Sequence, residues 1–290
     1  MVKVAVVTGA SSGLGLHLSI MLAKQGVKTY ATMRNLEKTQ ALLEEANNQG
    51  VDVGNTLIIK QLDVQLTSSV ESCINSILAE AGKIDILVNN AGAGFIRTTE
   101  QATEEDIKWA LDVNLLGVIR CTKAVLPIMR EAKSGHILNI SSVGGLVGQP
   151  FNEIYCAAKF AVEGYTESMA SYIQPCFNVN FTLVEPGGIA SEFANNALAQ
   201  FQISGGMVDD EYKPILEQYI QGAQSRSADG VYQTSEAVAQ VVLDCIAMAS
   251  PPVRIRTSQW AEDFCQIKTA QDPDGKRQQR EVIETFLSKN

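Results

Sequence analysis

The stretch KVAVVTGASSGLGLHLSIMLAKQG, residues 3–26, decides the fold. It begins with an unbroken apolar run, which favours a strand covered on both faces, as in a parallel sheet. A glycine turn follows, and an apolar helix is predicted to begin near Gly13. Gly9, Gly13 and Gly15 let the backbone approach a bound phosphate, and the free N–H groups at the helix start supply an anion site. This strand, turn and helix are the context of a dinucleotide site, although the spacing is not Gly-x-Gly-x-x-Gly.

Strands and helices alternate along the rest of the chain. Strands are expected near 3–8, 28–33, 56–62, 84–89, 135–141, 178–185 and 253–256. Helices are expected near 14–25, 36–48, 67–81, 103–131 (broken around 114–117), 153–174, 235–249 and 259–270. This alternation predicts an α/β fold, a single-domain Rossmann-like doubly wound parallel sheet of about seven strands with helices on both faces. The domain is expected to span 1–290, with a substrate-covering insertion at 188–230 and a C-terminal helical extension at 257–290.

The composition excludes several classes of function. A net charge of −9 argues against nucleic acid and anionic membranes as partners. No stretch approaches the ~18 apolar residues of a membrane span, and no leader precedes the first strand, so stable membrane insertion is not expected. The six cysteines are scattered, which fits reduced thiols and a cytoplasmic protein. Because the only histidines are His17 and His136, no metal site is predicted.

A candidate catalytic group lies in the middle of the chain. Tyr155 and Lys159 are four residues apart, and Ser142 lies thirteen residues before Tyr155. Residues at i and i+4 share one face of a helix. An ammonium beside a phenol favours the phenolate, so the pKa of Tyr155 is expected to fall from ~10 toward neutrality. A tyrosine with such a pKa exchanges a proton at working pH. Such a pair alone arises by chance in roughly one chain in three, so its weight comes from the glycine turn.

Six motifs stand in a fixed order along the chain: Thr8-Gly9-x-x-x-Gly13-x-Gly15, Asn89-Asn90-Ala91-Gly92, Asn114, Ser142, Tyr155-x-x-x-Lys159 and Pro186-Gly187. Together they resemble the short-chain dehydrogenase/reductase family over about residues 2–256. Within that family, the stretch that begins at Ser141 resembles the branch of 17β-hydroxysteroid dehydrogenase and photoreceptor retinol dehydrogenase. The resemblance implies an alcohol dehydrogenase or carbonyl reductase (ketoreductase). Such an enzyme transfers hydride between a nicotinamide cofactor and an apolar ketone, aldehyde or alcohol.

The resemblance also implies a role for each catalytic residue. Tyr155 protonates the carbonyl oxygen, or takes the proton in the reverse direction. Ser142 holds the substrate oxygen, with its neighbour Ser141 as the alternative. Lys159 lowers the pKa of Tyr155 and binds the nicotinamide ribose. Asn114 bends its helix and positions a water near Lys159, or else it is a kink residue without a catalytic role.

The choice of cofactor depends on the end of the second strand, where NAD-selective enzymes place an acidic residue against the adenosine ribose. Here Met33 occupies that position and Arg34 follows. A guanidinium suits the extra phosphate of NADP, so NADP(H) is predicted and NAD(H) is the weaker alternative. The alternative is that Arg34 is a solvated charge at the end of the strand and does not bind the cofactor. The implied cofactor contacts are Gly9, Ser11, Ser12, Gly13, Leu14, Gly15, Arg34, Asp63, Val64, Asn90, Ala91, Gly92, Tyr155, Lys159, Pro186, Gly187, Ile189 and Ser191.

The substrate is the least determined part of the prediction. Apolar residues of the insertion recur at helical spacing from Phe193 to Phe201, which suits a lid over a bulky apolar substrate or, equally, a helix core or a subunit contact. The resemblance further implies a homodimer or homotetramer through the helices at 103–131 and 153–174. Besides the oxidoreductase, the alternative is a catalytically silent NADP(H)-sensing or scaffold protein, which the complete catalytic set disfavours. The expected substrate contacts are Ser142, Val143, Gly145, Leu146, Phe151, Asn152 and Phe193.

Overall fold

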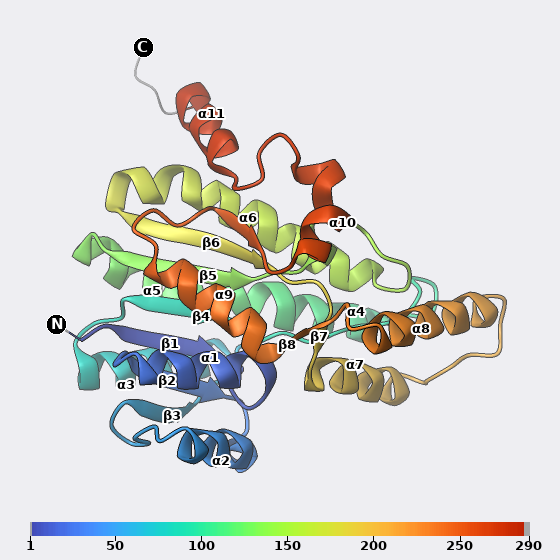
Figure 1. Cartoon of the computed structure of the whole chain (residues 1–290), viewed down its shortest axis with the longest axis horizontal. Coiled ribbons are helices and arrows are strands. Elements are labelled where there is room, and N and C mark those ends of the chain that lie inside the picture. Colours follow the sequence, from blue (N-terminus) through green and yellow to red (C-terminus); the bar gives the residue numbers. More distant parts are fainter. Residues whose placement is uncertain (1, 287–290) are drawn as a thin grey trace.

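The structure is a computed structural model that describes residues 2–286. Its main sheet has seven parallel strands in the order β3–β2–β1–β4–β5–β6–β9 (Figure 1). This arrangement confirms the predicted doubly wound α/β fold. The strand order reverses between β1 and β4, and in such sheets ligands bind outside the carboxyl ends of the strands at that point. The strands are Val4–Thr8 (β1), Lys28–Met33 (β2), Leu57–Gln61 (β3), Ile86–Asn89 (β4), Gly135–Ile140 (β5), Val179–Glu185 (β6) and Arg254–Arg256 (β9).

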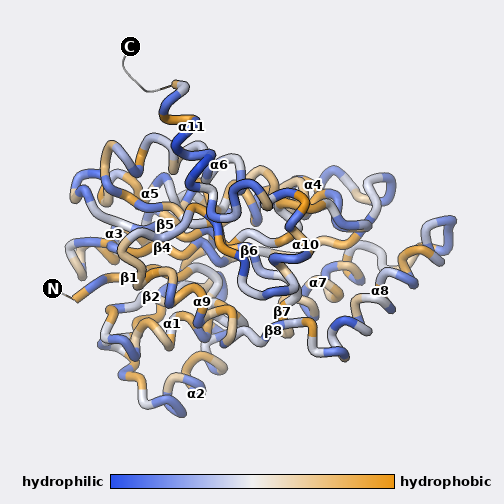
Figure 2. Tube along the Cα trace, turned by 45° about the horizontal axis from the view of Figure 1, so that its top comes forward, coloured by the Kyte–Doolittle hydropathy of each residue, from blue (hydrophilic) through white to orange (hydrophobic). Residues whose placement is uncertain are grey.

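Helices cover both faces of the sheet. One face packs against α1 (Gly13–Lys24), α2 (Gln40–Asn48) and α9 (Ser235–Ala247), and the other against α3 (Thr67–Ala81), α5 (Gly117–Ala132) and α6 (Glu153–Phe177). In β1, Ala5 and Val7 pack on the first face while Val4 and Val6 pack on the second. Successive side chains of a strand point to opposite faces, which is why a doubly covered strand is apolar throughout. Figure 2 shows apolar residues along the strands and hydrophilic ones on outlying segments.

The fourth predicted helix is broken, as expected. It consists of α4 (Glu104–Leu111), the π-helical turn η2 (Asp112–Leu116) and α5. A capping box between Thr103 and Asp106 begins α4. The π turn carries the buried Asn114, whose Nδ2 donates to the carbonyl of Ala110 at 2.9 Å. Single π turns inside α-helices occur mostly at functional sites.

The insertion and the extension are both helical. The insertion holds β7 (Ile189–Ala190), α7 (Glu192–Ile203) and α8 (Lys213–Ala228), and β8 (Gln233–Thr234) follows. Figure 1 shows α7 and α8 beyond the carboxyl ends of the strands. The extension holds α10 (Gln259–Thr269) and α11 (Lys276–Phe286), while its residues 287–290 lie outside the described part. Short 3₁₀ turns occur at Leu36–Lys38 (η1) and Val143–Gly145 (η3).

No helix within residues 2–286 is long and apolar enough to cross a membrane.

A buried chain of amide and hydroxyl groups connects the sheet to the helices behind it. Asn89 Nδ2 donates to Asn139 Oδ1 at 2.8 Å and to Thr122 Oγ1 at 3.1 Å. Asn139 Nδ2 in turn donates to Thr166 Oγ1 at 2.8 Å. Buried polar groups are stable only when they are hydrogen-bonded. The chain therefore fixes β4 and β5 against α5 and α6 just behind their carboxyl ends.

One buried histidine makes the stability of the fold depend on acidity. His136 in β5 is 7% exposed, and its Nε2 lies 2.9 Å from Thr182 Oγ1. Burial, with a smaller contribution from Lys3, lowers the pKa of His136 from 6.5 to about 3. Between these values the unfolded chain binds a proton that the folded protein does not. The free energy of unfolding should therefore fall as the pH falls, by about 1.4 kcal/mol per unit from this group.

We expect His136→Gln to weaken this acid-dependent loss of stability, because glutamine does not titrate. The measurement is urea unfolding at intervals from pH 4 to pH 7. His17→Gln, at a half-buried position of α1, is the matched control and should keep the slope of the wild type. An unchanged slope in His136→Gln would contradict the assignment.

Candidate active site

The turn between β1 and α1 is packed tightly against the end of β4. Gly9 has a φ of 68°, and a Cβ on it would lie 2.8 Å from Ala91 Cα. A Cβ on Gly15 would lie 2.5 Å from both the Gly9 carbonyl oxygen and Asn90 Nδ2. Asn90 Nδ2 donates to the carbonyls of Thr8 at 2.8 Å and Gly9 at 3.1 Å. Thr8 Oγ1 accepts from the backbone N–H groups of Asn90 and Ala91, both at 3.0 Å. These glycines are thus required for packing as well as for access to a ligand.

The start of α1 has the properties of a phosphate site. In the described part of the chain, no side chain caps this helix at Ser12, and its first turn has no acidic residue. Its first N–H groups are therefore available to an anion, which the helix dipole also favours. Gly13 has a φ of 57°, and a Cβ on it would lie 3.5 Å from Ser191 Cβ and 3.7 Å from Ser235 Oγ. The residues present fit a dinucleotide pyrophosphate. Ser235, at the start of α9, was not predicted from the sequence.

The other predicted cofactor residues lie mainly along the carboxyl edge of the sheet. Arg34 follows β2 and is exposed, whereas Met33 is buried. Asp63 follows β3, and its Oδ1 accepts from the N–H of Gln65 at 3.0 Å. Ser191 is the N-cap of α7 and accepts from the N–H of Phe193 at 3.3 Å. The remaining predicted contacts are Ser11 and Leu14 at the glycine turn, Val64 beside Gly117, Gly92 after β4, Pro186 and Gly187 after β6, and Ile189 in β7.

The end of β5 meets one face of α6 at the candidate catalytic residues. The side chain of Ser142 lies next to that of Tyr155. Ser142 Oγ accepts from the N–H of Gly144 at 3.0 Å, which leaves its own proton free to donate. Lys159 Nζ donates to the carbonyl of Ile140 at 2.9 Å and lies 5.7 Å from the centroid of the Tyr155 ring. The structure thus brings together three of the four predicted catalytic residues.

The fourth residue, Asn114, reaches the same place from the π turn. Its Oδ1 accepts from the N–H of Ala93 at 3.1 Å, and its Nδ2 donates to the carbonyl of Ala93 at 2.8 Å. A Cβ on Gly92 would lie 3.0 Å from Asn114 Oδ1 and 3.7 Å from Lys159 Nζ. Gly92 therefore lies against both Asn114 and Lys159. The two-fold hydrogen bond fixes the loop after β4 to the π turn.

The pKa of Tyr155 differs from the value that the sequence predicts. Burial raises the pKa of Tyr155 to about 12, and the neighbouring hydroxyl of Ser142 opposes this only in part. The predicted fall of the Tyr155 pKa toward neutrality is therefore wrong, because the desolvation of the phenolate outweighs the effects of the neighbouring side chains. Burial lowers the pKa of Lys159 to about 8. At neutral pH the site thus combines a protonated phenol with an ammonium group.

Helix α7 of the insertion lies next to the candidate catalytic residues. The Phe193 ring of α7 lies 6.1 Å from the Tyr155 ring, and Phe193 is 42% exposed. A Cβ on Gly94 would lie 2.6 Å from Ala197 Cβ, so the loop after β4 contacts α7 closely. The buried Arg97 of that loop donates to the carbonyls of Phe201 at 3.3 Å and Gly206 at 3.2 Å, and to Ser204 Oγ at 3.3 Å. A cation at the C-terminal end of a helix is favourable, so Arg97 anchors α7. Sequence analysis did not identify Arg97.

The predicted substrate residues separate into three groups. Ser142 and Phe193 adjoin Tyr155, as described. Val143 and Leu146 pack against α10, and Gly145 packs against Ser141 and Glu163. Phe151 belongs to an apolar cluster with Phe201 and Leu216, and Asn152 Nδ2 donates to the hydroxyl of Tyr219 at 2.8 Å. The last group links the loop before α6 to α7 and α8.

Comparison with known proteins identifies the family. Residues 3–201 match the short chain dehydrogenase family. Retinol dehydrogenase 8 of Bos taurus is 38% identical over 278 residues, which cover 94% of this chain and 86% of that protein. The 17-beta-hydroxysteroid dehydrogenase type 1 of Homo sapiens is 37% identical over 259 residues, which cover 88% and 77%. The chain belongs to the short chain dehydrogenase family, as its motifs predicted.

Solved structures agree with this assignment. A short chain dehydrogenase/reductase from Burkholderia phymatum in complex with NAD has the same fold, with a TM-score of 0.78, 23% identity and coverage of 100% and 96% of the two chains. A single-site variant of actinorhodin polyketide ketoreductase with NADPH has a TM-score of 0.73, 27% identity and coverage of 88% and 96%. The chain is thus an alcohol or carbonyl oxidoreductase that uses a nicotinamide cofactor.

Gly15→Ala should abolish tight binding of NADPH, because the added methyl would overlap the Gly9 carbonyl and displace the turn. Gly164→Ala is the matched control, since a Cβ at Gly164 meets no atom of the described residues within 4 Å. We expect that control to bind NADPH as the wild type does. Cofactor fluorescence titration measures both, and circular dichroism checks that each variant folds. Unchanged binding in Gly15→Ala would refute the assignment of this turn.

Proposed function

We propose that the chain is an NADP(H)-dependent carbonyl reductase, or alcohol dehydrogenase in the reverse direction, for apolar ketones, aldehydes or alcohols. The observation that carries the proposal is the arrangement of Tyr155 next to Ser142 and one helical turn from the buried Lys159. A phenol that keeps its proton at neutral pH is suited to protonate a carbonyl oxygen. The nicotinamide, when bound, supplies or accepts the hydride.

In reduction, the substrate oxygen accepts hydrogen bonds from the hydroxyls of Ser142 and Tyr155, which orient the carbonyl. As the carbonyl carbon gains a hydride, its C=O π bond breaks and the oxygen takes the proton of Tyr155. The alcohol leaves, and Tyr155 is regenerated by a proton from solvent. The Lys159 ammonium stabilises the phenolate that forms in between. In oxidation the same groups act in reverse, and Tyr155 takes the proton of the alcohol.

The substrate class is proposed from the surroundings of Tyr155. The apolar ring of Phe193 adjoins the phenol, and the cluster of Phe151, Phe201 and Leu216 holds α7 and α8 in place beside it. Such surroundings favour a substrate with an apolar body and a single reacting oxygen. The names of the relatives, a retinol and a steroid dehydrogenase, support the same class. We assign the cover of the substrate to residues 188–230, within one catalytic domain.

The cellular setting is also a proposal. All six cysteines lie within the described residues and are free, which supports a reducing compartment and hence the cytoplasm.

Three large apolar side chains on the π turn and α6 are partly exposed: Leu116 at 42%, Phe160 at 42% and Tyr172 at 43%. Exposed apolar residues on these helices support a homodimer or homotetramer through them. Gel filtration with light scattering tests this assembly.

NADP(H) is proposed over NAD(H) because Arg34 is exposed at the end of β2. Within residues 2–286 its guanidinium makes no ion pair, and no acidic residue occupies the position of the buried Met33. A free guanidinium can bind the 2′-phosphate of the adenosine ribose through two hydrogen bonds.

The first test is turnover with a panel of a 17-ketosteroid, all-trans-retinal, and small and bulky aryl ketones. We expect NADPH oxidation with at least one apolar carbonyl. Tyr155→Phe should reduce kcat by at least about a thousandfold, because the proton donor is lost, while the Kd for NADPH changes little. Tight NADPH binding without turnover of any substrate in the wild type would instead favour the sensing or scaffold function. Full activity of Tyr155→Phe would refute the mechanism.

Arg34→Asp should lower kcat/KM for NADPH by about tenfold to a hundredfold, the effect of losing one charged hydrogen-bonding partner. The value for NADH should rise, because the carboxylate binds the ribose hydroxyls. Lys268→Asp makes the same change of charge on the exposed face of α10 and is the control, with an expected unchanged ratio. An unchanged NADPH/NADH ratio in Arg34→Asp would show that this residue does not select the cofactor.

A further inference from the structure

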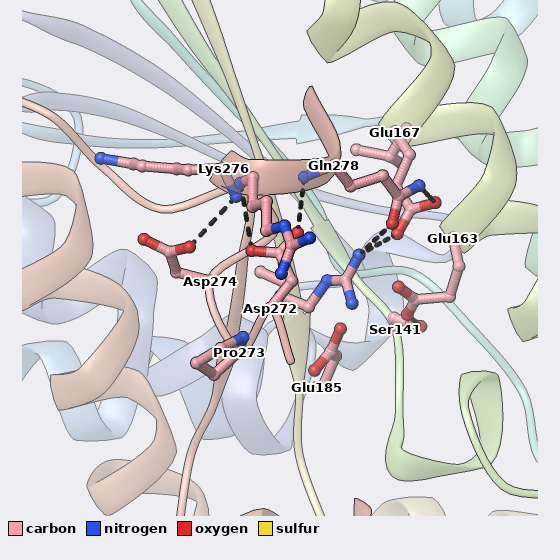
Figure 3. A network of polar contacts seen from close by, with 12 residues as sticks. Ser141, Glu163, Glu167, Glu185, Asp272, Pro273, Asp274, Lys276 and Gln278 are labelled. Carbon is pink, nitrogen blue, oxygen red and sulfur yellow. Dashed lines mark hydrogen bonds and ion pairs between the residues drawn. The ribbon is translucent and has the colours of Figure 1, made fainter. Parts of the chain in front are cut away.

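The end of β5 is bound to α6 at three points. Residues 140–142 are consecutive, and Tyr155, Lys159 and Glu163 lie at successive steps of four on α6, so they share one face of the helix. As described above, the Ile140 carbonyl accepts a hydrogen bond from Lys159, and Ser142 lies next to Tyr155. The middle one, Ser141, donates a hydrogen bond to Glu163 Oε1. Figure 3 shows Ser141 beside Glu163. The third contact has no role in the proposed mechanism.

Glu163 faces a second buried carboxyl group. Glu163 is 5% exposed and Glu185 of β6 is fully buried, and the two carboxyl groups are close enough for Glu185 to raise the pKa of Glu163. Arg256 Nη1 binds Glu185 Oε2 at 3.0 Å. Within residues 2–286, Glu163 Oε2 and Glu185 Oε1 are buried without a hydrogen-bond partner, which a proton shared between them would supply. Two carboxyl groups form a hydrogen bond only if one carries a proton. Because the guanidinium stabilises Glu185 as the carboxylate, the proton belongs to Glu163.

The balance of charge around Glu163 leads to the same conclusion. Arg254 pairs with Glu167, and Arg256 pairs with Glu185 and Glu262. Together with Lys159, these three cations balance three carboxylates, so a carboxylate at Glu163 would be a buried negative charge in excess. Burial and the adjacent Glu185 raise the pKa of Glu163 well above its usual value. The charged neighbours are Lys159 and Glu167 of α6, Glu185 of β6, Arg254 and Arg256 of β9, and Glu262 of α10, with the titratable thiol of Cys265 also on α10.

We propose that Glu163 is a positioning residue that acts in its neutral, protonated form. It accepts from Ser141 and donates to Glu185, and so fixes the end of β5 on α6 in the register that places Ser142 beside Tyr155. A Cβ on Gly145 would lie 2.7 Å from Ser141 Oγ and 2.9 Å from Glu163 Oε1, so this contact fills its space. The effect on catalysis rests on the proposed roles of Ser142 and Tyr155, whereas the protonation of Glu163 does not.

Glu163→Gln tests the protonation without any assay of activity. Glutamine has the shape of the neutral acid, accepts from Ser141 through its oxygen and donates to Glu185 through its amide. In the wild type, the folded state holds a proton that the unfolded chain releases above about pH 4.5, so stability falls as the pH rises toward the folded pKa. The unfolding equilibrium constant of the wild type should therefore rise relative to that of Glu163→Gln, by up to tenfold per pH unit.

The measurement is urea unfolding of both proteins from pH 5 to pH 9. Glu167→Gln, one turn along α6, is the matched control, because Glu167 contacts Arg254 and not Ser141. We expect this control to keep the pH dependence of the wild type. Parallel pH curves for the wild type and Glu163→Gln, or failure of Glu163→Gln to fold, would show that Glu163 is ionised and would overturn the proposal.

Kinetics test the positioning role. With whichever carbonyl of the panel is turned over, Glu163→Gln should retain kcat within about threefold of the wild type. Glu163→Leu and Ser141→Ala should each lower kcat at least tenfold, with the KM for NADPH within threefold. Ser141→Ala keeps the shared proton, so its unfolding should retain the pH dependence of the wild type. Equal kcat in Glu163→Gln and Glu163→Leu would overturn the positioning role, even where the unfolding data support the neutral form.

Discussion

Lys159 is a buried ammonium group, and the carboxyl end of the sheet is arranged around it. A buried charge is stable only when polar groups replace its lost hydration. The carbonyl of Ile140 does so at 2.9 Å, and this contact requires that β5 end where α6 passes. Burial still lowers the pKa of Lys159 to about 8. This value remains above 7, so the ammonium is still the main form at pH 7. The same desolvation raises the pKa of Tyr155, so one environment produces both the acid and its counter-charge.

The parts of the fold that hold this environment are themselves polar and buried. Asn89, Asn139 and Thr166 connect β4 and β5 to α6 on one side of the strand ends. On the other side, Arg256 and Glu185 connect β9 to β6. Directional hydrogen bonds and ion pairs of this kind fix geometry more sharply than apolar packing alone, at a cost in desolvation. Tyr155 and Lys159 are therefore held on a helix, α6, that is fixed to the sheet, and not on a loop.

Much of this structure was predictable from the sequence. The strand ends and the glycine turn follow from local patterns, because doubly covered strands are apolar throughout and tight turns need glycine. The α8 helix was missed, because Leu216 is its only residue that is buried, so no apolar period marks it. The pKa of Tyr155 was predicted in the wrong direction, since the sequence shows the neighbouring lysine but not the burial. Glu163 had a weak signal, its position four residues after Lys159 on the same face.

The two halves of the site differ in how they depend on the sequence. The cofactor side is set by backbone contacts, such as Gly9 against Ala91, that only a few residue types permit. The proposed substrate side is set by side chains of an insertion that Arg97 anchors through the carbonyls of Phe201 and Gly206. Substitution at Phe193 changes the surface beside Tyr155 without touching the groups that determine its pKa. Chemistry and substrate preference are therefore separable, because they are built from different elements of the fold.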